Sequence, residues 1–137
     1  MGEVRVKVRL TNAADLALLR KNVIPVDEVH TYEAGGLVDT GAVTLVVPSA
    51  VAAHLDLVRF SKQVAMCADG REEEVDVAGP VSVEIMGRQM TTDALILGDE
   101  VIIGQIVLEM TDLFVDPLGH RLVPNPAHPD QPVLKVK

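Results

Sequence analysis

Apolar and polar residues alternate along the first stretch of the chain. From Val4 to Leu10, valine or leucine occupies every second position, and arginine or lysine occupies the positions between. A period of two residues is typical of a strand with one buried face. We therefore predict a half-buried strand whose solvent-facing side is basic.

A short helix is expected directly after this strand. Asn12 is a favourable N-cap residue, and Asp15 would then lie in the first turn of the helix. Arg20 and Lys21 would lie in the last turn, where positive charge complements the helix dipole. Because proline does not continue a helix interior, the helix should end before Pro25.

The remainder of the chain has the pattern of many short strands with few helices. Strands are predicted at 29–38, 43–47, 81–85, 89–97, 101–103 and 113–115, and short helices at about 50–55 and 105–111. Residues 64–77 are predicted to form a hairpin that turns at the dipeptide Asp69-Gly70. The tail after Val123 contains four prolines, so we expect it to be extended or loosely ordered.

Composition and charge narrow the class of protein. The 137 residues are 48% apolar, which suits one domain with a core and argues against a disordered chain. The net charge of −8 argues against nucleic acid as a partner. The single cysteine, Cys67, cannot form an internal disulfide. With no signal-peptide pattern and no apolar run long enough to span a bilayer, we expect a cytoplasmic protein without a membrane partner.

The tripeptide Asp39-Thr40-Gly41 is the strongest candidate for chemistry. It lies between two apolar segments, 36–38 and 43–47, so the carboxylate would stand on a loop held by buried strands. Glycine at the third position lets the backbone approach the carboxylate and donate to it. The alternative interpretation is an ordinary turn, because Asp, Thr and Gly are common turn residues.

A second segment makes the motif more specific. About sixty residues later, Ile102-Ile103-Gly104 places two large apolar residues and a glycine before a predicted helix. Together with Asp39-Thr40-Gly41-Ala42 and the hairpin around Asp69-Gly70, this segment resembles the retropepsin-like aspartic proteases, most closely the small single-domain bacterial members. The similarity covers roughly Val29 to Val115.

The resemblance implies a fold and roles for individual residues. It implies one mainly β domain over residues 1–137, a retropepsin-like acid-protease barrel with two or three short helices, active as a homodimer. The core would span about 29–123, followed by a Pro-rich tail at 124–137. Asp39 would be catalytic, with Thr40, Gly41 and Ala42 completing the active-site loop. The flap over the substrate would be formed by Ala68, Asp69, Gly70 and Arg71, and the loop would be supported from beneath by Ile102, Ile103 and Gly104.

The implied activity is that of an aspartic endopeptidase. Two crowded carboxylates share a proton and activate a water molecule, yet the chain contains a single Asp-Thr-Gly, so the second carboxylate must come from a second copy. The expected partners are a peptide or protein substrate and a second copy of the chain, with no cofactor. The alternative function is a catalytically silent dimeric binding or scaffold module that keeps this fold.

The chain departs from the compact viral members of the family in several places. The flap tip has fewer glycines, and Glu72-Glu73-Glu74 places three acids on one arm. Gln105 stands where viral members often carry arginine. The segment 11–28 is an insertion, and the chain continues for more than twenty residues after the last helix, whereas viral members end in a short interface strand. The dimer interface is therefore expected to be built differently.

Other reactive residues predict no further site. The four histidines, His30, His54, His120 and His128, show no metal-ligand spacing, so no metal is expected. A triad of His54 with nearby serine and aspartate is disfavoured, because residues this close in sequence seldom converge in that way. For Cys67, which lies near the predicted flap, a packed thiol is favoured over redox control.

Overall fold

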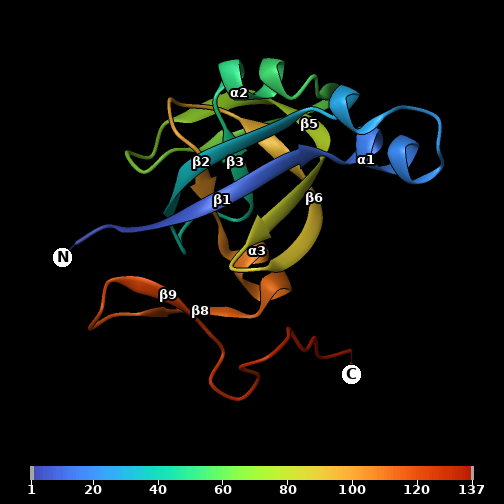
Figure 1. Cartoon of the computed structure of the whole chain (residues 1–137). Helices are drawn as coiled ribbons and strands as arrows, with labels where there is room; N and C mark the ends of the chain where they lie inside the picture. Colours follow the sequence, from blue (N-terminus) through green and yellow to red (C-terminus); the bar gives the residue numbers. More distant parts are fainter. Residues whose placement is uncertain (1, 137) are drawn as a thin grey trace.

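The computed structural model describes residues 2–136, and within them the chain is mainly β with short helices (Figure 1). The strands are β1 (Val4–Asn12), β2 (Thr31–Val38), β3 (Leu45–Val47), β4 (Val58–Met66), β5 (Glu72–Ile85), β6 (Arg88–Ile96), β7 (Ile102–Ile103), β8 (Leu113–Asp116) and β9 (Arg121–Pro124). The helices are α1 (Ala13–Arg20), a 3-10 turn η1 (Val26–Glu28), α2 (Ser49–His54) and α3 (Gln105–Thr111). The prediction of a mainly β chain with two or three short helices is confirmed.

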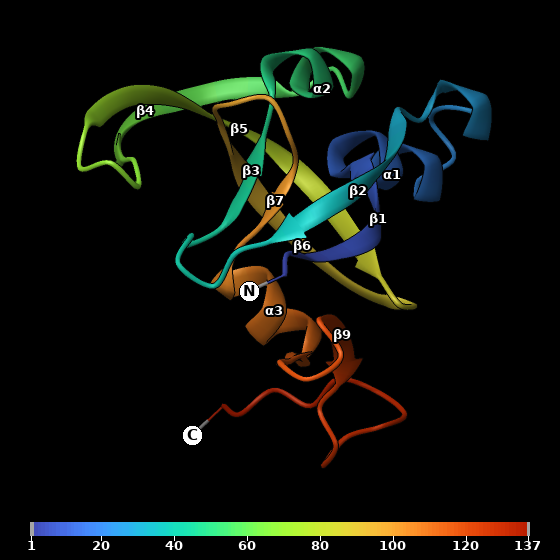
Figure 2. The same ribbon diagram turned by 90° about the vertical axis from the view of Figure 1, so that its left-hand side faces the viewer.

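The main sheet curls into a barrel. Its seven strands follow the order β1-β2-β7-β3-β6-β5-β4, and β1 also pairs with β5, which closes the first six strands into a ring. Strand β4 therefore extends the sheet at one side and forms a long hairpin with β5 (Figure 2). Strands β8 and β9 form a separate two-stranded ribbon, which lies beneath the barrel and α3 in Figure 1.

The buried core fills this barrel and begins with the first strand. Val8 and Leu10 of β1 are fully buried, as the alternating pattern predicted, while the basic residues between them face solvent. They pack with apolar residues from β3, β5, β7 and the helices. The buried core thus includes residues of a strand that precedes residue 29.

Asn12 joins the first strand to the first helix. Its side-chain oxygen accepts a 3.0 Å hydrogen bond from the amide of Asp15, the predicted N-cap contact. Its side-chain nitrogen donates to the backbone carbonyls of Leu55 and Asp56, at 2.9 and 3.1 Å. The residue is buried, so these bonds satisfy its polar atoms away from water.

Two predictions of strand boundaries need correction. Strand β5 continues without a break from Glu72 to Ile85, where the second arm of a hairpin ending at 77 and a separate strand at 81–85 were predicted; Pro80 is accommodated at an irregularity of the β5–β6 register. In the predicted strand 43–47, Val43 is exposed and only Leu45–Val47 pair as a strand. Within 43–47, the apolar residues are therefore buried only from Leu45 onward, where the chain has left the loop that precedes β3.

Candidate active-site loop

The loop that carries Asp39 is held at its base by two strands. Strand β2 ends at Val38 and pairs in parallel with β7, so that Val38 lies opposite Ile103. The amide of Asp39 then donates a 3.0 Å hydrogen bond to the carbonyl of Ile103, and the amide of Leu37 donates to Val101 at 2.9 Å. Both contacts join residues more than sixty positions apart and fix where the carboxylate leaves the barrel.

Inside the loop, the backbone folds back toward the carboxylate. The amide of Gly41 donates a 2.9 Å hydrogen bond to Oδ1 of Asp39, and the amide of Ala42 donates a 3.1 Å bond to the Asp39 carbonyl. A Cβ at position 41 would stand 3.1 Å from the same carboxylate oxygen, so glycine allows this approach. Asp39, Thr40 and Gly41 are exposed, and Ala42 is half-buried.

Gly104 supports the loop from beneath. A Cβ at this position would lie 2.6 Å from the Thr44 nitrogen and 2.8 Å from the Ala42 carbonyl oxygen, closer than real Cβ atoms approach. The next two amides, of Gln105 and Ile106, donate to the carbonyls of Ala42 and Val43 at 2.8 and 2.9 Å. The structure therefore brings together the two segments of the sequence motif, 39–42 and 102–104.

The predicted flap residues form the turn of the β4–β5 hairpin. Cys67 and Arg71 close the turn with a 2.7 Å backbone hydrogen bond, and Gly70 adopts a φ of +84°. The side chain of Asp69 accepts from the amide of Arg71 at 3.0 Å, and Ala68 to Arg71 are all exposed. Figure 2 shows this hairpin and the loop between β2 and β3 projecting on the same side of the molecule.

Charged side chains brace the lower part of the hairpin. Asp76 of β5 forms ion pairs with Lys62, at 2.9 Å, and with Arg59, both on β4. The hydrogen bonds from Lys62 and Arg59 lower the pKa of Asp76 below its ordinary value. The three acids Glu72–Glu74 farther up the arm are exposed, so the acidic arm predicted from the sequence faces solvent.

A cluster around Asp112 was not anticipated from the sequence. Its carboxylate accepts from the Asn125 side chain at 2.9 Å and from the Val133 amide at 3.1 Å, and it contacts His128 Nδ1 at 2.6 Å. These bonds, the one from Asn125 first, lower the pKa of Asp112. The tail is therefore fastened between residues 125 and 133.

Arg88 completes this attachment. Its guanidinium is buried and donates to the carbonyls of Thr111, Asp112 and His128 at 3.2, 3.0 and 2.6 Å. Sequence reasoning assigned the Gly87-Arg88 pair to a turn, and it predicted an extended or loosely ordered tail without these contacts. No local sequence pattern indicates that Arg88 binds these carbonyls, because the contacts join residues up to forty positions apart.

Among residues 2–136, no group of three or more His, Cys, Asp or Glu side chains is arranged to hold a metal ion. Within the same residues, no helix has both the length and the apolar character needed to cross a membrane. His54, considered above for a triad, instead donates through Nε2 to the Thr31 carbonyl at 3.1 Å.

Comparison with known proteins finds matches among solved structures. No family model matches the chain, and no curated protein matches it. Among the solved structures that match is the solution structure of the simian foamy virus (mac) protease, at 15% sequence identity and a TM-score of 0.48. The match covers 76% of this chain and 90% of the viral chain.

Proposed function

We propose that this chain is an aspartic endopeptidase that acts as a homodimer, with one Asp39 carboxylate contributed by each subunit. The observation that carries the proposal is the exposed Asp39 side chain, held by the Gly41 amide on a loop that Gly104 supports from beneath. A carboxylate in this position is rigid and accessible to substrate, which are the two requirements for a catalytic group on a loop.

The chemistry follows from the repulsion between two carboxylates. Groups about 3 Å apart, as in known aspartic proteases, cannot both be ionised and share one proton. The ionised member takes a proton from water as the water oxygen bonds to the scissile carbonyl carbon, and the other member gives its proton to the carbonyl oxygen. When the resulting gem-diol collapses, the C–N bond breaks, the leaving nitrogen takes the proton of the dyad, and a hydroxyl proton of the gem-diol passes to the dyad and restores the shared proton.

The second carboxylate is assigned to another copy of the chain because the sequence contains a single Asp-Thr-Gly. Asp69 uses its carboxylate to close the hairpin turn. Asp112 is engaged by the tail, and Asp76 by two cations. A two-fold axis beside Asp39 would supply the missing group with the same geometry on both sides.

The β4–β5 hairpin is assigned to cover the substrate. Its tip, Ala68–Arg71, is exposed and extends beyond the barrel on the side of the Asp39 loop. A cover of this kind would exclude water from the reacting bond once a peptide is bound, and it must open to admit the peptide. The closer similarity to small bacterial members of the family remains a prediction.

A peptide-cleavage assay tests this function. Purified protein is incubated with a diverse peptide library from acidic to neutral pH, with and without pepstatin, beside the Asp39→Asn variant. The expected result is cleavage that pepstatin and the variant both abolish. A dimer that binds peptides without cleaving them would instead support the alternative of a silent binding module.

A further inference from the structure

A row of three hollows follows β1 on the outer face of the sheet. Their volumes are about 400, 370 and 500 Å³. Lys7 lines the first two hollows and Arg9 lines the last two, so the three are continuous. Together they form the β1 groove, which runs from Arg5 to Thr11, a stretch of about 20 Å in an extended strand.

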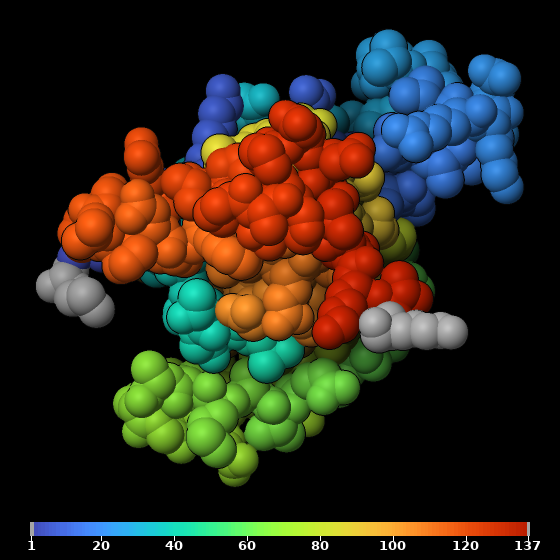
Figure 3. Space-filling model, turned by 90° about the horizontal axis from the view of Figure 1, so that it is seen from below, coloured from blue at the N-terminus to red at the C-terminus, as the bar shows by residue number. Residues whose placement is uncertain are grey.

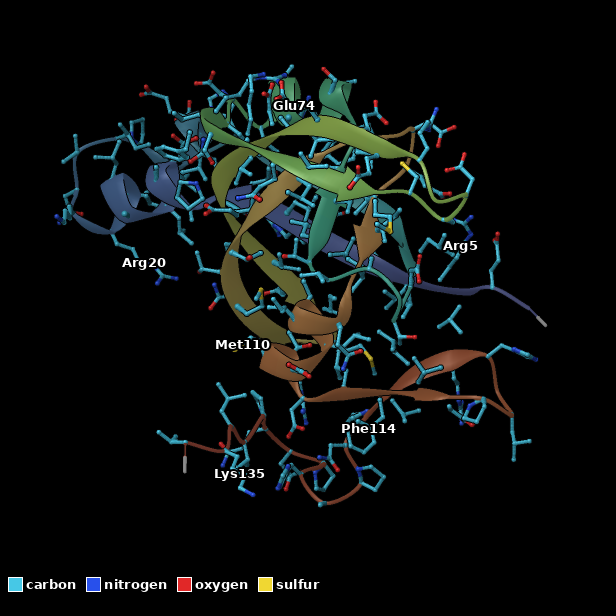
Figure 4. All side chains as sticks on the ribbon, turned by 180° about the vertical axis from the view of Figure 1, so that it is seen from behind. Arg5, Arg20, Glu74, Met110, Phe114 and Lys135 are labelled. Atoms are coloured by element: carbon cyan, nitrogen blue, oxygen red, sulfur yellow. The ribbon has the colours of Figure 1, made fainter. Side chains whose placement is uncertain are left out.

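The floor and walls of the β1 groove come from separate parts of the chain. The basic side chains at odd-numbered positions of β1 form the floor and are exposed, whereas the even-numbered Val8 and Leu10 are buried in the core. Strands β2 and β5 flank this floor, because both pair with β1. The far end is walled by the segment 11–28, which stands out in blue from one side of the molecule in Figure 3. Figure 4 labels Arg5 and Arg20, which lie toward opposite ends of the groove.

Gly35 leaves the groove open beside Lys7, its partner in the β1–β2 register. The backbone of Gly35 does not adopt the left-handed conformation, and a Cβ there would meet no atom within 4 Å. The neighbouring Gly36 differs, because a Cβ there would stand 2.9 Å from Ile103. Glycine inside a strand costs stability, and it often marks a place where another backbone approaches closely. Nothing within residues 2–136 makes that approach at Gly35, so the space is open to a partner.

The β1 groove gathers positive charge in an acidic chain. Its lining holds four of the chain's twelve Lys and Arg residues but three of its twenty Asp and Glu residues. Arg5 is paired with two glutamates, whereas the Lys7 ammonium is mostly exposed and 4.0 Å from Glu33. Arg9 stands between Glu33 and Glu84 in the register, yet it forms no ion pair with any described residue. Lys7 and Arg9 are therefore available to carboxylates from another molecule.

We propose that the β1 groove binds an acidic, extended segment of a partner polypeptide. Carboxylates at every second position of that segment match Lys7 and Arg9, because residues two apart in any strand are about 6.6 Å apart. The backbone of the segment approaches the sheet over Gly35, where no side chain blocks it. No residue that lines the groove belongs to the Asp39 loop, 39–42, or to the hairpin tip, 68–71. The inference therefore goes beyond the proposed catalytic function and does not depend on it.

Two variants and their matched controls test the groove. The probe is a fluorescein-labelled peptide of alternating glutamate and threonine, and fluorescence anisotropy at low ionic strength measures its dissociation constant. Gly35→Val, which fills the open space, should raise this constant about tenfold or more, whereas Gln63→Val, at an exposed strand position outside the groove, should leave it nearly unchanged. The double variant Lys7→Gln/Arg9→Gln should raise it about fivefold, the scale of two exposed charge contacts. Lys21→Gln/Lys135→Gln removes the same charge outside the groove and should change it by less than about twofold.

The binding site is separated from the proposed active site by pepstatin, which should neither displace the probe nor change its affinity. Thermal unfolding establishes that each variant is folded, and Gly35→Ala repeats the test if Gly35→Val unfolds. A peptide with lysine in place of glutamate, and a single-stranded thymidine decamer, should bind much more weakly than the probe. The inference would be overturned by a probe that does not bind, by displacement with pepstatin, by equal binding of the decamer, or by equal weakening in the control variants.

Discussion

The backbone of Thr44 occupies the space into which a side chain at Gly104 would project. A Cβ at Gly104 would lie 2.6 Å from the Thr44 nitrogen, and backbone atoms cannot move aside as a flexible side chain can. Thr44 lies two residues after Ala42, the last residue of the Asp39 loop. Gly104 is the N-cap residue of α3. The close contact therefore couples the position of the candidate catalytic loop to the start of the last helix.

Replacing Gly104 by alanine should disrupt this contact. We expect Gly104→Ala to lower the free energy of unfolding by about 3 kcal/mol, the upper part of the range for an overpacked site, because the clash is with backbone. Peptide cleavage should fall with it, since the loop would shift. Urea unfolding and turnover measure the two effects.

Gly35→Ala is the control for that substitution. A Cβ at Gly35 would have no atom within 4 Å, and the residue lies in β2. Its stability should be unchanged or higher by about 0.5–1 kcal/mol, because alanine loses less backbone entropy in a strand. Equal tolerance of alanine at both positions would contradict the supporting role of Gly104.

Much of the fold near the loop was predictable because its signals are local. The alternating segment from Val4 predicted β1, Asn12 predicted the start of α1, and the predicted range 105–111 matches α3. Turn residues at Asp69-Gly70 predicted the hairpin. Each of these predictions rests on residues within one segment of about seven positions.

The hairpin tip should be the most mobile part of the proposed site. Residues Ala68–Arg71 are exposed and are bonded to near neighbours in the hairpin, whereas Val75 lower on the same hairpin is buried. We expect fast amide hydrogen exchange at the tip in the free protein, slowed by a bound peptide inhibitor. Amides of the barrel strand around Val83, which is fully buried, should not respond. Strong protection of the tip without ligand would argue against a flap.

The attachment of the tail to Asp112 should depend on pH. The hydrogen bonds from Asn125, Val133 and His128 lower the pKa of Asp112 below its ordinary 3.8. A lowered folded-state pKa stabilises the folded chain at pH above that value, and the stabilisation is lost as pH falls through the folded pKa. Asp112→Asn should therefore lower the melting temperature at neutral pH, and the difference from wild type should shrink below about pH 3.8.

Asp99→Asn is the comparison for this prediction, because Asp99 is exposed in the turn before β7. It should leave the melting temperature nearly unchanged across the pH range. Hydrogen exchange in residues 125–133 should increase in Asp112→Asn alone. An Asp112→Asn variant as stable as wild type at neutral pH would show that the tail is held by other contacts.

The parts that sequence reasoning missed depend on long-range contacts. Arg88 follows a turn glycine, a position that is usually solvated, yet its guanidinium is buried against the end of α3. Strand β9 is only four residues long and lies just before a Pro-rich tail, so its pairing with β8 is what defines it. The contacts of Arg88 and the pairing of β8 with β9 cannot be predicted from sequence, because they depend on where the tail lies relative to α3.

The assignment of Asp39 predicts two effects of one substitution. In Asp39→Asn, the amide oxygen can still accept the hydrogen bond from the Gly41 amide, so the loop should keep its shape. The variant loses the base, and the site can no longer share one proton between two carboxyl groups. Because the repulsion between crowded carboxylates also disappears, the dimer should be as stable as wild type or more stable.

Turnover of a cleaved peptide by wild type and Asp39→Asn, measured from acidic to neutral pH together with the dimer melting temperature, tests this account most directly. We predict that the variant falls to background cleavage at every pH while its melting temperature holds or rises. Undiminished turnover in Asp39→Asn would remove Asp39 from the mechanism and leave it as a turn residue, for which asparagine is among the best replacements.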